Sequence, residues 1–348
     1  MESDNTTIVD KIPEKVSESS LTPRPEAPGL EATIVLHDRG DATLILGDDA
    51  DTRQPVLVSK TAMCLASSVW KAMFEPHWRE NEATEIPLPD DDIEATLIAL
   101  RIAHLRFHEL PKEHGLTIET LHALAMVCDK YDLVRLVRPF LDLHEWSECH
   151  FPLKKKRARY HPNWLFFAWT FGYKDSFIAF EKYITQRIGL DAHGNAVTDD
   201  CYGFPDHFPP DLLERMMHIR NTVLTAMLDE LYKALDRIIE GPVCCSKSNY
   251  EKKCRSMVLG SYVSFLLENN LYPKRCTPTE TSLSIKRLSN LVADSEIAIY
   301  ESAYEPSHKH ISCSQVFDFK STIKKHFSDI GSAVLDSHLR HMEKQATK

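Results

Sequence analysis

Glycine is scarce in this chain of 348 residues, with only 11 present. Phosphate-binding loops need several glycines so that backbone N–H groups can approach the phosphate, and hydrolase elbows need the pattern Gly-x-Ser-x-Gly. Neither pattern occurs, and no Cys or Ser has a base at the spacing of a catalytic motif. The sequence therefore predicts a protein that is not an enzyme.

An excess of positive charge and long apolar runs are lacking too. The formal net charge is −10, whereas proteins that grip nucleic-acid backbones need clustered basic surface. The longest apolar run, 164–173, covers about ten positions, and a helix that spans a membrane needs roughly twenty. We therefore expect no direct nucleic-acid partner and no membrane partner.

The cysteines lack the spacing of a disulfide framework. Nine are present, an odd number, and the start of the sequence has no apolar segment of the kind that directs secretion. Thiols at such positions are typical of a reducing compartment. We expect a cytoplasmic or nuclear protein, or one found in both places, without structural disulfides.

What the chain does have is a mixed pattern of short strands and helices, and its 43% hydrophobic content is ample for a packed core. A first strand at 33–37 is followed by a turn that returns the chain into a strand at 43–46, and 55–58 follows as the next strand. Pro87 cannot donate to a ladder, so 86–88 should be an edge strand. Helical spacing then predicts that one face is buried by Met63, Leu65, Val69, Met73, Trp70 and Phe74.

Several ordered motifs give the region a family resemblance. They are Gly40–Leu44, Val58–Lys60, Ser67–Phe74, the acidic turn Asp90–Asp92 and Cys128–Tyr131. Together they resemble a BTB/POZ domain of the fungal type, with a weaker similarity from 164 to 335 to the helical tails of such proteins. One departure is Ser59, where many BTB domains carry His before the Lys. The resemblance implies an α+β fold, a small sheet capped by helices, which acts in protein–protein interaction and homodimerises.

The resemblance also implies partner-binding residues at Trp78 and Glu80. BTB substrate adaptors of ubiquitin ligases carry a hydrophobic-x-Glu motif at this place, and the motif helps to dock a cullin scaffold. Trp78 would be the apolar anchor and Glu80 the charged contact. The alternative is a loop in which Trp78 covers the protein's own core and Glu80 is solvated.

Asp41 and Lys60 match positions that line a charged groove between the subunits of some BTB dimers. A buried pair at such a place specifies a partner more than it stabilises the fold. The alternative is a local ion pair at the end of a strand.

One dense basic run stands out in this acidic chain, at Lys154, Lys155, Lys156, Arg157 and Arg159. Such runs are typical of nuclear-import signals, with Lys154–Arg157 as the candidate here. The alternative is a solvated linker between domains, and Pro162 favours a boundary at this point.

Helical patterns recur in the second half. Aromatic residues predict two helices between 163 and 188, broken near Gly172; a loop follows at 189–208, and a long apolar stripe predicts a helix from about 211 to 240. Further helices are expected at 255–268, 281–292 and 315–339. The predicted organisation is a disordered tail at 1–31, a BTB/POZ domain at 32–148, a basic linker at 149–162 and a helical domain at 163–348.

Cysteine and histidine gather in the C-terminal half, at Cys244, Cys245, Cys254, Cys276, His308, His310 and Cys313. Zinc takes four such ligands in a tetrahedron, but the spacing fits no standard finger. Buried cysteine as a small hydrophobe is the other interpretation. The set Cys254, Cys276, His308, His310 and Cys313 is therefore a zinc hypothesis that a metal measurement on the purified protein would test, and no other cofactor is expected.

The sequence thus leaves three functions to compare. The first is a homodimeric scaffold or adaptor, and the second is a cullin-linked adaptor whose tail selects a protein substrate. The third belongs to a different class: a zinc-dependent regulator or enzyme.

Overall fold

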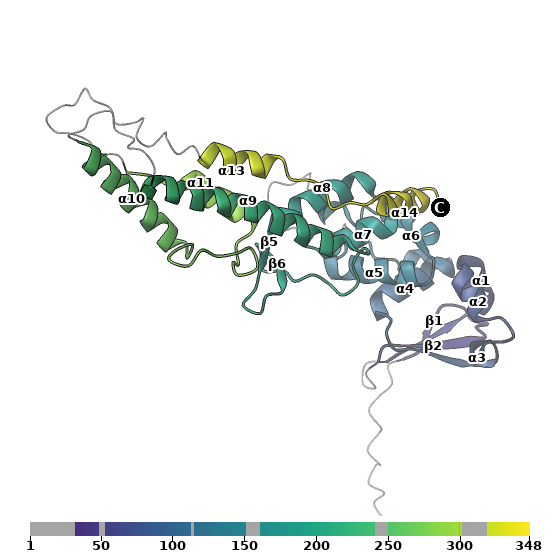
Figure 1. Cartoon of the computed structure of the whole chain (residues 1–348). Helices are drawn as coiled ribbons and strands as arrows, with labels where there is room; N and C mark the ends of the chain where they lie inside the picture. Colours follow the sequence, from purple (N-terminus) through teal and green to yellow (C-terminus); the bar gives the residue numbers. More distant parts are fainter. Residues whose placement is uncertain are drawn as a thin grey trace, which may run out of the picture.

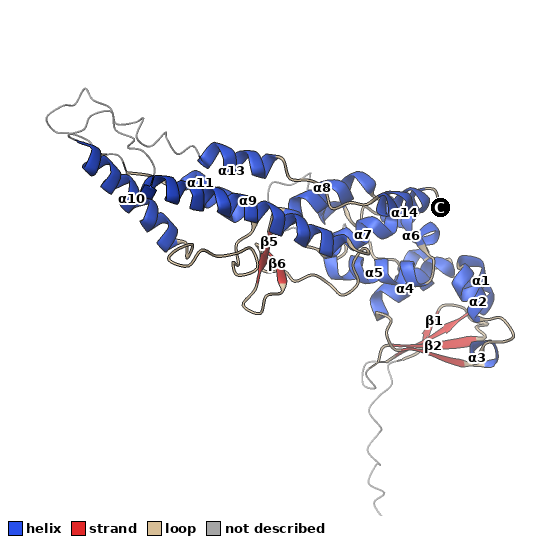
Figure 2. Cartoon of the chain, in the orientation of Figure 1, coloured by secondary structure: helices blue, strands red, loops and turns tan. Residues whose placement is uncertain are grey.

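The computed structural model describes residues 32–48, 53–112, 115–150, 161–240, 250–298, 300 and 319–348. The tail predicted at 1–31 and the basic run Lys154–Arg157 lie outside these residues. Helices dominate, with two small sheets among them (Figure 2), so the predicted α+β class is confirmed. The molecule is elongated, and the four-stranded sheet lies at one end (Figure 1).

That sheet has the strand order β1-β3-β2-β4. Its strands are β1 (Ile34–Val35), β2 (Ala42–Leu46), β3 (Gln54–Val58) and β4 (Glu85–Leu88). β4 is an edge strand, as Pro87 predicted. The expected return of the first strand directly into the second is wrong, because β1 pairs in parallel with β3 while β2 pairs with the opposite side of β3. The turn at 37–40 carries the chain from one side of β3 to the other.

Six helices follow on this sheet and beside it: α1 (Lys60–Ala66), α2 (Ser68–Met73), α3 (Arg79–Glu82), α4 (Ile93–Ala103), α5 (Ile118–Lys130) and α6 (Val134–Leu143). Short polar side chains begin several of them. Ser59, Ser67, Asp92 and Thr117 each accept a hydrogen bond from a backbone N–H in the first turn of the helix that follows. These caps satisfy donors that have no partner inside the helix.

The second half contains α7 (Asn163–Phe171), α8 (Lys174–Thr185), the hairpin of β5 (Ile188–Leu190) and β6 (Ala196–Thr198), α9 (Leu212–Glu240), α10 (Glu251–Glu268), α11 (Ile285–Asp294), α13 (Phe319–Ser328) and α14 (Asp336–Ala346). Two expectations are wrong here. The hairpin occupies part of the predicted loop at 189–208, and the single helix predicted at 315–339 is divided between α13 and α14. The division has a physical cause, since the buried carboxylate of Glu181 accepts from Ala333 N–H at 3.0 Å and Ser332 Oγ–H at 2.9 Å.

Buried apolar side chains form two large clusters. The first contains residues between Leu36 and Met216 and is completed by Ala333 and Met342 from the C-terminal segment. The second contains residues between Leu224 and Ile330. Helix α9 contributes to both, and α14 returns the end of the chain to the first cluster beside α7 (Figure 1).

The first cluster contains residues from both sides of the predicted linker at 149–162. Trp146 and Trp164 flank that segment, and both are fully buried in the same cluster. Helices α5 and α7 also pack directly against each other. The division into domains at 32–148 and 163–348 stays a prediction.

A buried cation lies where the two clusters meet on α9. The guanidinium of Arg220 donates to backbone oxygens of Ile188, Pro278, Thr281 and Leu283, all at 2.9 Å. Burial lowers the pKa of Arg220 to about 10, so the group stays charged at neutral pH. A buried charge is tolerated only when it is fully hydrogen-bonded. Arg220 therefore fastens β5 and the 278–283 segment to α9.

Candidate partner-binding surface

The exposed indole of Trp78 marks the start of α3. Its side chain is 53% exposed, and its ring lies 5.5 Å from that of His77. Glu80 follows in the first turn of α3 and is half-buried. With half its surface in water, Trp78 belongs to none of the buried apolar clusters, and its role as a partner anchor stays a prediction.

Lys60 contacts the C-terminal carbonyl groups of α3 through its side chain, and Asp41 contacts Lys60. The Lys60 ammonium donates to the carbonyl oxygens of Glu80, Asn81 and Ala83 at 3.1, 2.8 and 3.0 Å. Asp41 accepts from the backbone N–H of Lys60 at 2.7 Å. The structure thus brings Asp41, Lys60 and Glu80 together, but in the described part of the chain the Asp41 and Lys60 side chains form no ion pair with each other. Lys60 instead neutralises the negative end of the α3 dipole.

Two apolar side chains on α1 and α2 face water, contrary to the expected burial. Leu65 is 86% exposed and Val69 is 39% exposed, whereas Met63 and Trp70 are fully buried. The cause is Ser67, which ends α1 and begins α2, and whose Oγ accepts from Trp70 N–H at 3.0 Å. Helical spacing cannot be continued across that break, so the face predicted from residues 63 to 74 is divided. The result is an exposed apolar surface that the sequence pattern did not predict.

Two of the motifs behind the family resemblance contact each other. Asp91, in the acidic turn, is buried and accepts from Lys130 Nζ at 2.7 Å and from the Tyr131 hydroxyl at 2.5 Å. Burial, together with the hydrogen bond to Asp91, raises the pKa of Tyr131 far above its usual value. The same tyrosine also accepts at its backbone oxygen from Ser67 Oγ–H at 2.5 Å. These contacts hold the acidic turn, α2 and the end of α5 in one arrangement.

The proposed zinc ligands are only partly visible. Cys244, Cys245, His308, His310 and Cys313 lie outside the described residues. Cys254 is buried in a small cluster with Tyr250 and Tyr300, whereas Cys276 contacts the hydroxyl of Tyr232 at 3.3 Å. Within the described ranges, no group of three or more His, Cys, Asp or Glu side chains is placed to hold a metal ion.

Comparison of the chain with known protein families and with curated proteins finds no match. The resemblance to BTB/POZ domains therefore stays a prediction from the motifs in the sequence. In the part of the chain that the structure describes, no helix combines the length and the apolar content that crossing a membrane requires.

Proposed function

We propose that residues 32–148 form a BTB/POZ-type interaction domain and that the protein is a homodimeric scaffold or adaptor. The small sheet with helices on one side supports this proposal, as does the contact between the acidic turn and the end of α5. The helical second half would supply the surface for other partners. Neither half is proposed to carry out catalysis.

The observation that carries self-association is the exposed apolar surface of α1 and α2. Leu65 and Val69 lie on neighbouring helices of the same small unit. Burying a fully exposed side chain of this kind contributes about 1.5–3 kcal/mol, and Val69, which is only 39% exposed, would contribute less than half of that. In a two-fold dimer each side chain counts twice, since the same patch is used on both subunits. Such a surface is therefore more favourable in a dimer than in water.

Sedimentation equilibrium at micromolar concentration tests self-association. We expect the wild-type protein to be a dimer and Leu65→Glu to weaken the dimer by a factor of ten or more, about 1.4 kcal/mol. The matched control is Leu143→Glu, because Leu143 is 73% exposed but lies at the end of α6. A wild-type protein that stays monomeric at tens of micromolar would contradict the proposal.

A second candidate role is that of a cullin-linked adaptor, and the exposed Trp78 favours it. In that role Trp78 enters a pocket of the cullin, Glu80 provides the charged contact, and the helical half selects the substrate. The carbonyl contacts of Lys60 hold α3 in place for such a contact before the partner arrives. Preorganisation of this kind reduces the entropy that binding costs.

Binding to a purified cullin scaffold tests the adaptor role. Trp78→Ala should weaken binding by about 2 kcal/mol or more if the indole is an anchor. Glu80→Ala should weaken binding too, leave the melting temperature nearly unchanged and leave the dimer intact. The adaptor role fails if wild-type protein at tens of micromolar retains no cullin.

A further inference from the structure

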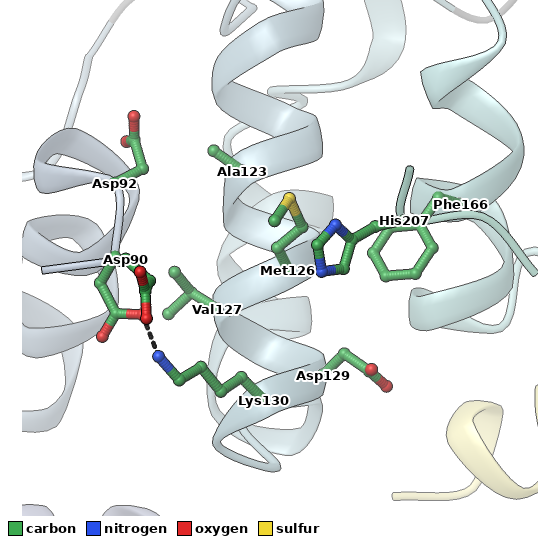
Figure 3. A pocket seen from close by; sticks show the side chains of 10 residues that line it. Asp90, Asp92, Ala123, Met126, Val127, Asp129, Lys130, Phe166 and His207 are labelled. Carbon is green, nitrogen blue, oxygen red and sulfur yellow. Dashed lines mark hydrogen bonds and ion pairs between the residues drawn. The ribbon is translucent and has the colours of Figure 1, made fainter. Parts of the chain in front are cut away.

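A pocket lies over α5, beside the contact between Asp91 and Lys130. Its volume is about 530 Å³, within the range of small-ligand sites. The acidic turn, α5, α7 and the loop before α9 all contribute to it, through Asp90, Asp92, Met126, Asp129, Phe166 and His207 among others. Figure 3 shows the acidic turn on one side of α5 and the two rings, Phe166 and His207, on the other.

Negative charge dominates the polar part of this pocket. Four carboxylates line it and only one ammonium, that of Lys130. Lys130 is already committed, because its Nζ donates to Asp91 at 2.7 Å. Among the described residues, Asp90 and Asp129 have neither a hydrogen bond nor an ion pair through their side chains. Partial desolvation raises the pKa of Asp129, so this carboxylate would gain from a cation brought close to it.

The remaining walls are apolar or aromatic. Met126 and Val127 lie on α5, and the exposed ring of His207 borders the pocket, whereas Phe166 of α7 is only 5% exposed. A planar guanidinium can stack on an aromatic ring, lay its methylene groups on apolar side chains and donate to a carboxylate through two N–H groups at once. A lysine ammonium satisfies the carboxylates but lacks the plane that stacks.

We propose that this pocket binds an arginine side chain presented by a peptide segment of a protein partner. Asp129 would receive the guanidinium, the ring of His207 would flank its plane, and Met126 would contact its methylene groups. The pocket would be a second binding surface, and its partner would be a protein with an exposed arginine. This inference rests on the proposed interaction function in one respect, because it requires a protein partner.

Titration with peptides tests the proposal on the full chain. The probe is a short acetylated peptide with two arginines separated by glycine, and its control replaces both arginines by citrulline, which has the same shape without the charge. Methyl NMR of the methionines reports the location, with the Met126 signal assigned through Met126→Leu. The arginine peptide should shift that signal, and the citrulline peptide should bind at least tenfold more weakly. Equal binding of the two peptides, or no shift at Met126, would overturn the proposal.

Charge-neutralising variants then locate the contact. Asp129→Asn should weaken the arginine peptide about tenfold, whereas Asp90→Asn, on the other side of α5, should weaken it less. The matched control is Asp294→Asn, which removes the same charge at an exposed position at the end of α11. If the control weakens binding as much as Asp129→Asn does, only general electrostatics are at work and the site is wrong.

Two further arms separate the alternatives. Spermidine that binds as tightly as the arginine peptide and displaces it would show that the pocket takes a free cation, which contradicts a peptide ligand. Sedimentation of the same samples keeps the two proposals apart. If the protein dimerises but does not bind the peptide, only the arginine site is overturned. If Leu65→Glu abolishes dimerisation but the peptide still binds, the arginine site is unaffected.

Discussion

Two short helices, α3 and α14, attach to the same half of the molecule in opposite ways. Each is associated with a Trp–His ring pair. At α3 the rings of Trp78 and His77 lie 5.5 Å apart and both face water. At α14 the rings of His341 and Trp169 are stacked 3.8 Å apart at 8°, and both are half-buried.

The polar contacts of α14 tie it to several distant elements. The buried ring of His338 accepts from Leu335 N–H at 3.1 Å and donates through Nε2–H to Pro210 O at 2.7 Å. After the helix, Lys348 pairs with Asp132 at 2.6 Å. Helix α3 has the ammonium of Lys60 as its main polar attachment. The difference indicates that α14 is part of the core. Helix α3 is fixed by Lys60, but no other part of the described chain covers Trp78 beside it.

The largest effect should come from disturbing the α14 contact at Gly172. Its φ is +73°, and a Cβ there would lie 2.6 Å from Met342 O and 2.8 Å from Ala346 N. The left-handed conformation costs a residue with Cβ about 1–2 kcal/mol, and the overlap adds a similar amount. Gly172→Ala should therefore lower the free energy of unfolding by about 3 kcal/mol, measured by urea denaturation.

Gly194→Ala is the matched control for that variant. Gly194 also has a positive φ, +85°, but a Cβ there meets nothing within 4 Å. Only the conformational cost of about 1 kcal/mol should appear. An equal decrease in the free energy of unfolding of the two variants would mean that α14 does not pack closely against Gly172. In that case α14 would be attached no more tightly than α3.

The features that the sequence predicted are those that depend on neighbouring residues. Gly172 ends α7 as expected, and the apolar stripe of α9 continues to Glu240. Such features need only a left-handed glycine or a repeated spacing, both of which lie within one segment.

The features that the sequence missed depend on distant residues. Ala333 lies in the break between α13 and α14 because Glu181, 152 positions earlier, accepts from its backbone N–H. The pocket over α5 joins Asp90 to His207, and no spacing rule connects them. Only the exposure of Leu65 had a local signal in the sequence. Ser67 is a preferred residue at the start of a helix, and a new helix at that point interrupts the helical spacing.

A smaller effect is expected at Lys60, which holds α3. Lys60→Met keeps an unbranched side chain that is one atom shorter, and removes three donors to carbonyl oxygens. We expect a loss of about 1 kcal/mol in the free energy of unfolding. Amide exchange in α3 should also accelerate while exchange in α14 stays unchanged.

Lys71→Met provides the control for Lys60. Lys71 is exposed on the neighbouring helix α2, and within the described residues its side chain donates no hydrogen bond. The variant should leave both stability and exchange nearly unchanged. If α3 exchanges at the wild-type rate in Lys60→Met, then something other than the ammonium holds this helix.

The smallest effect concerns pH and the ring that packs α14 against α7. Burial lowers the pKa of His341, and the neighbouring charges of Lys348 and Lys344 lower it further. The unfolded chain binds a proton at this ring near pH 6.5, while the folded chain still does not. Its contribution to stability is therefore present above about pH 6.5 and lost as the pH falls through the lowered pKa of the folded state.

His341→Phe keeps a ring against Trp169 and removes the titration. Between pH 7 and pH 5 the free energy of unfolding should fall less steeply in this variant than in the wild type, yet still fall, because burial also lowers the pKa of His104, His122 and His161. His77→Phe supplies the control from the α3 side, because it makes the same substitution at an exposed ring. Should the two variants show the same slope, the stacked ring of α14 would be as open to water as the ring beside α3, and the two helices would not differ in the way that the structure indicates.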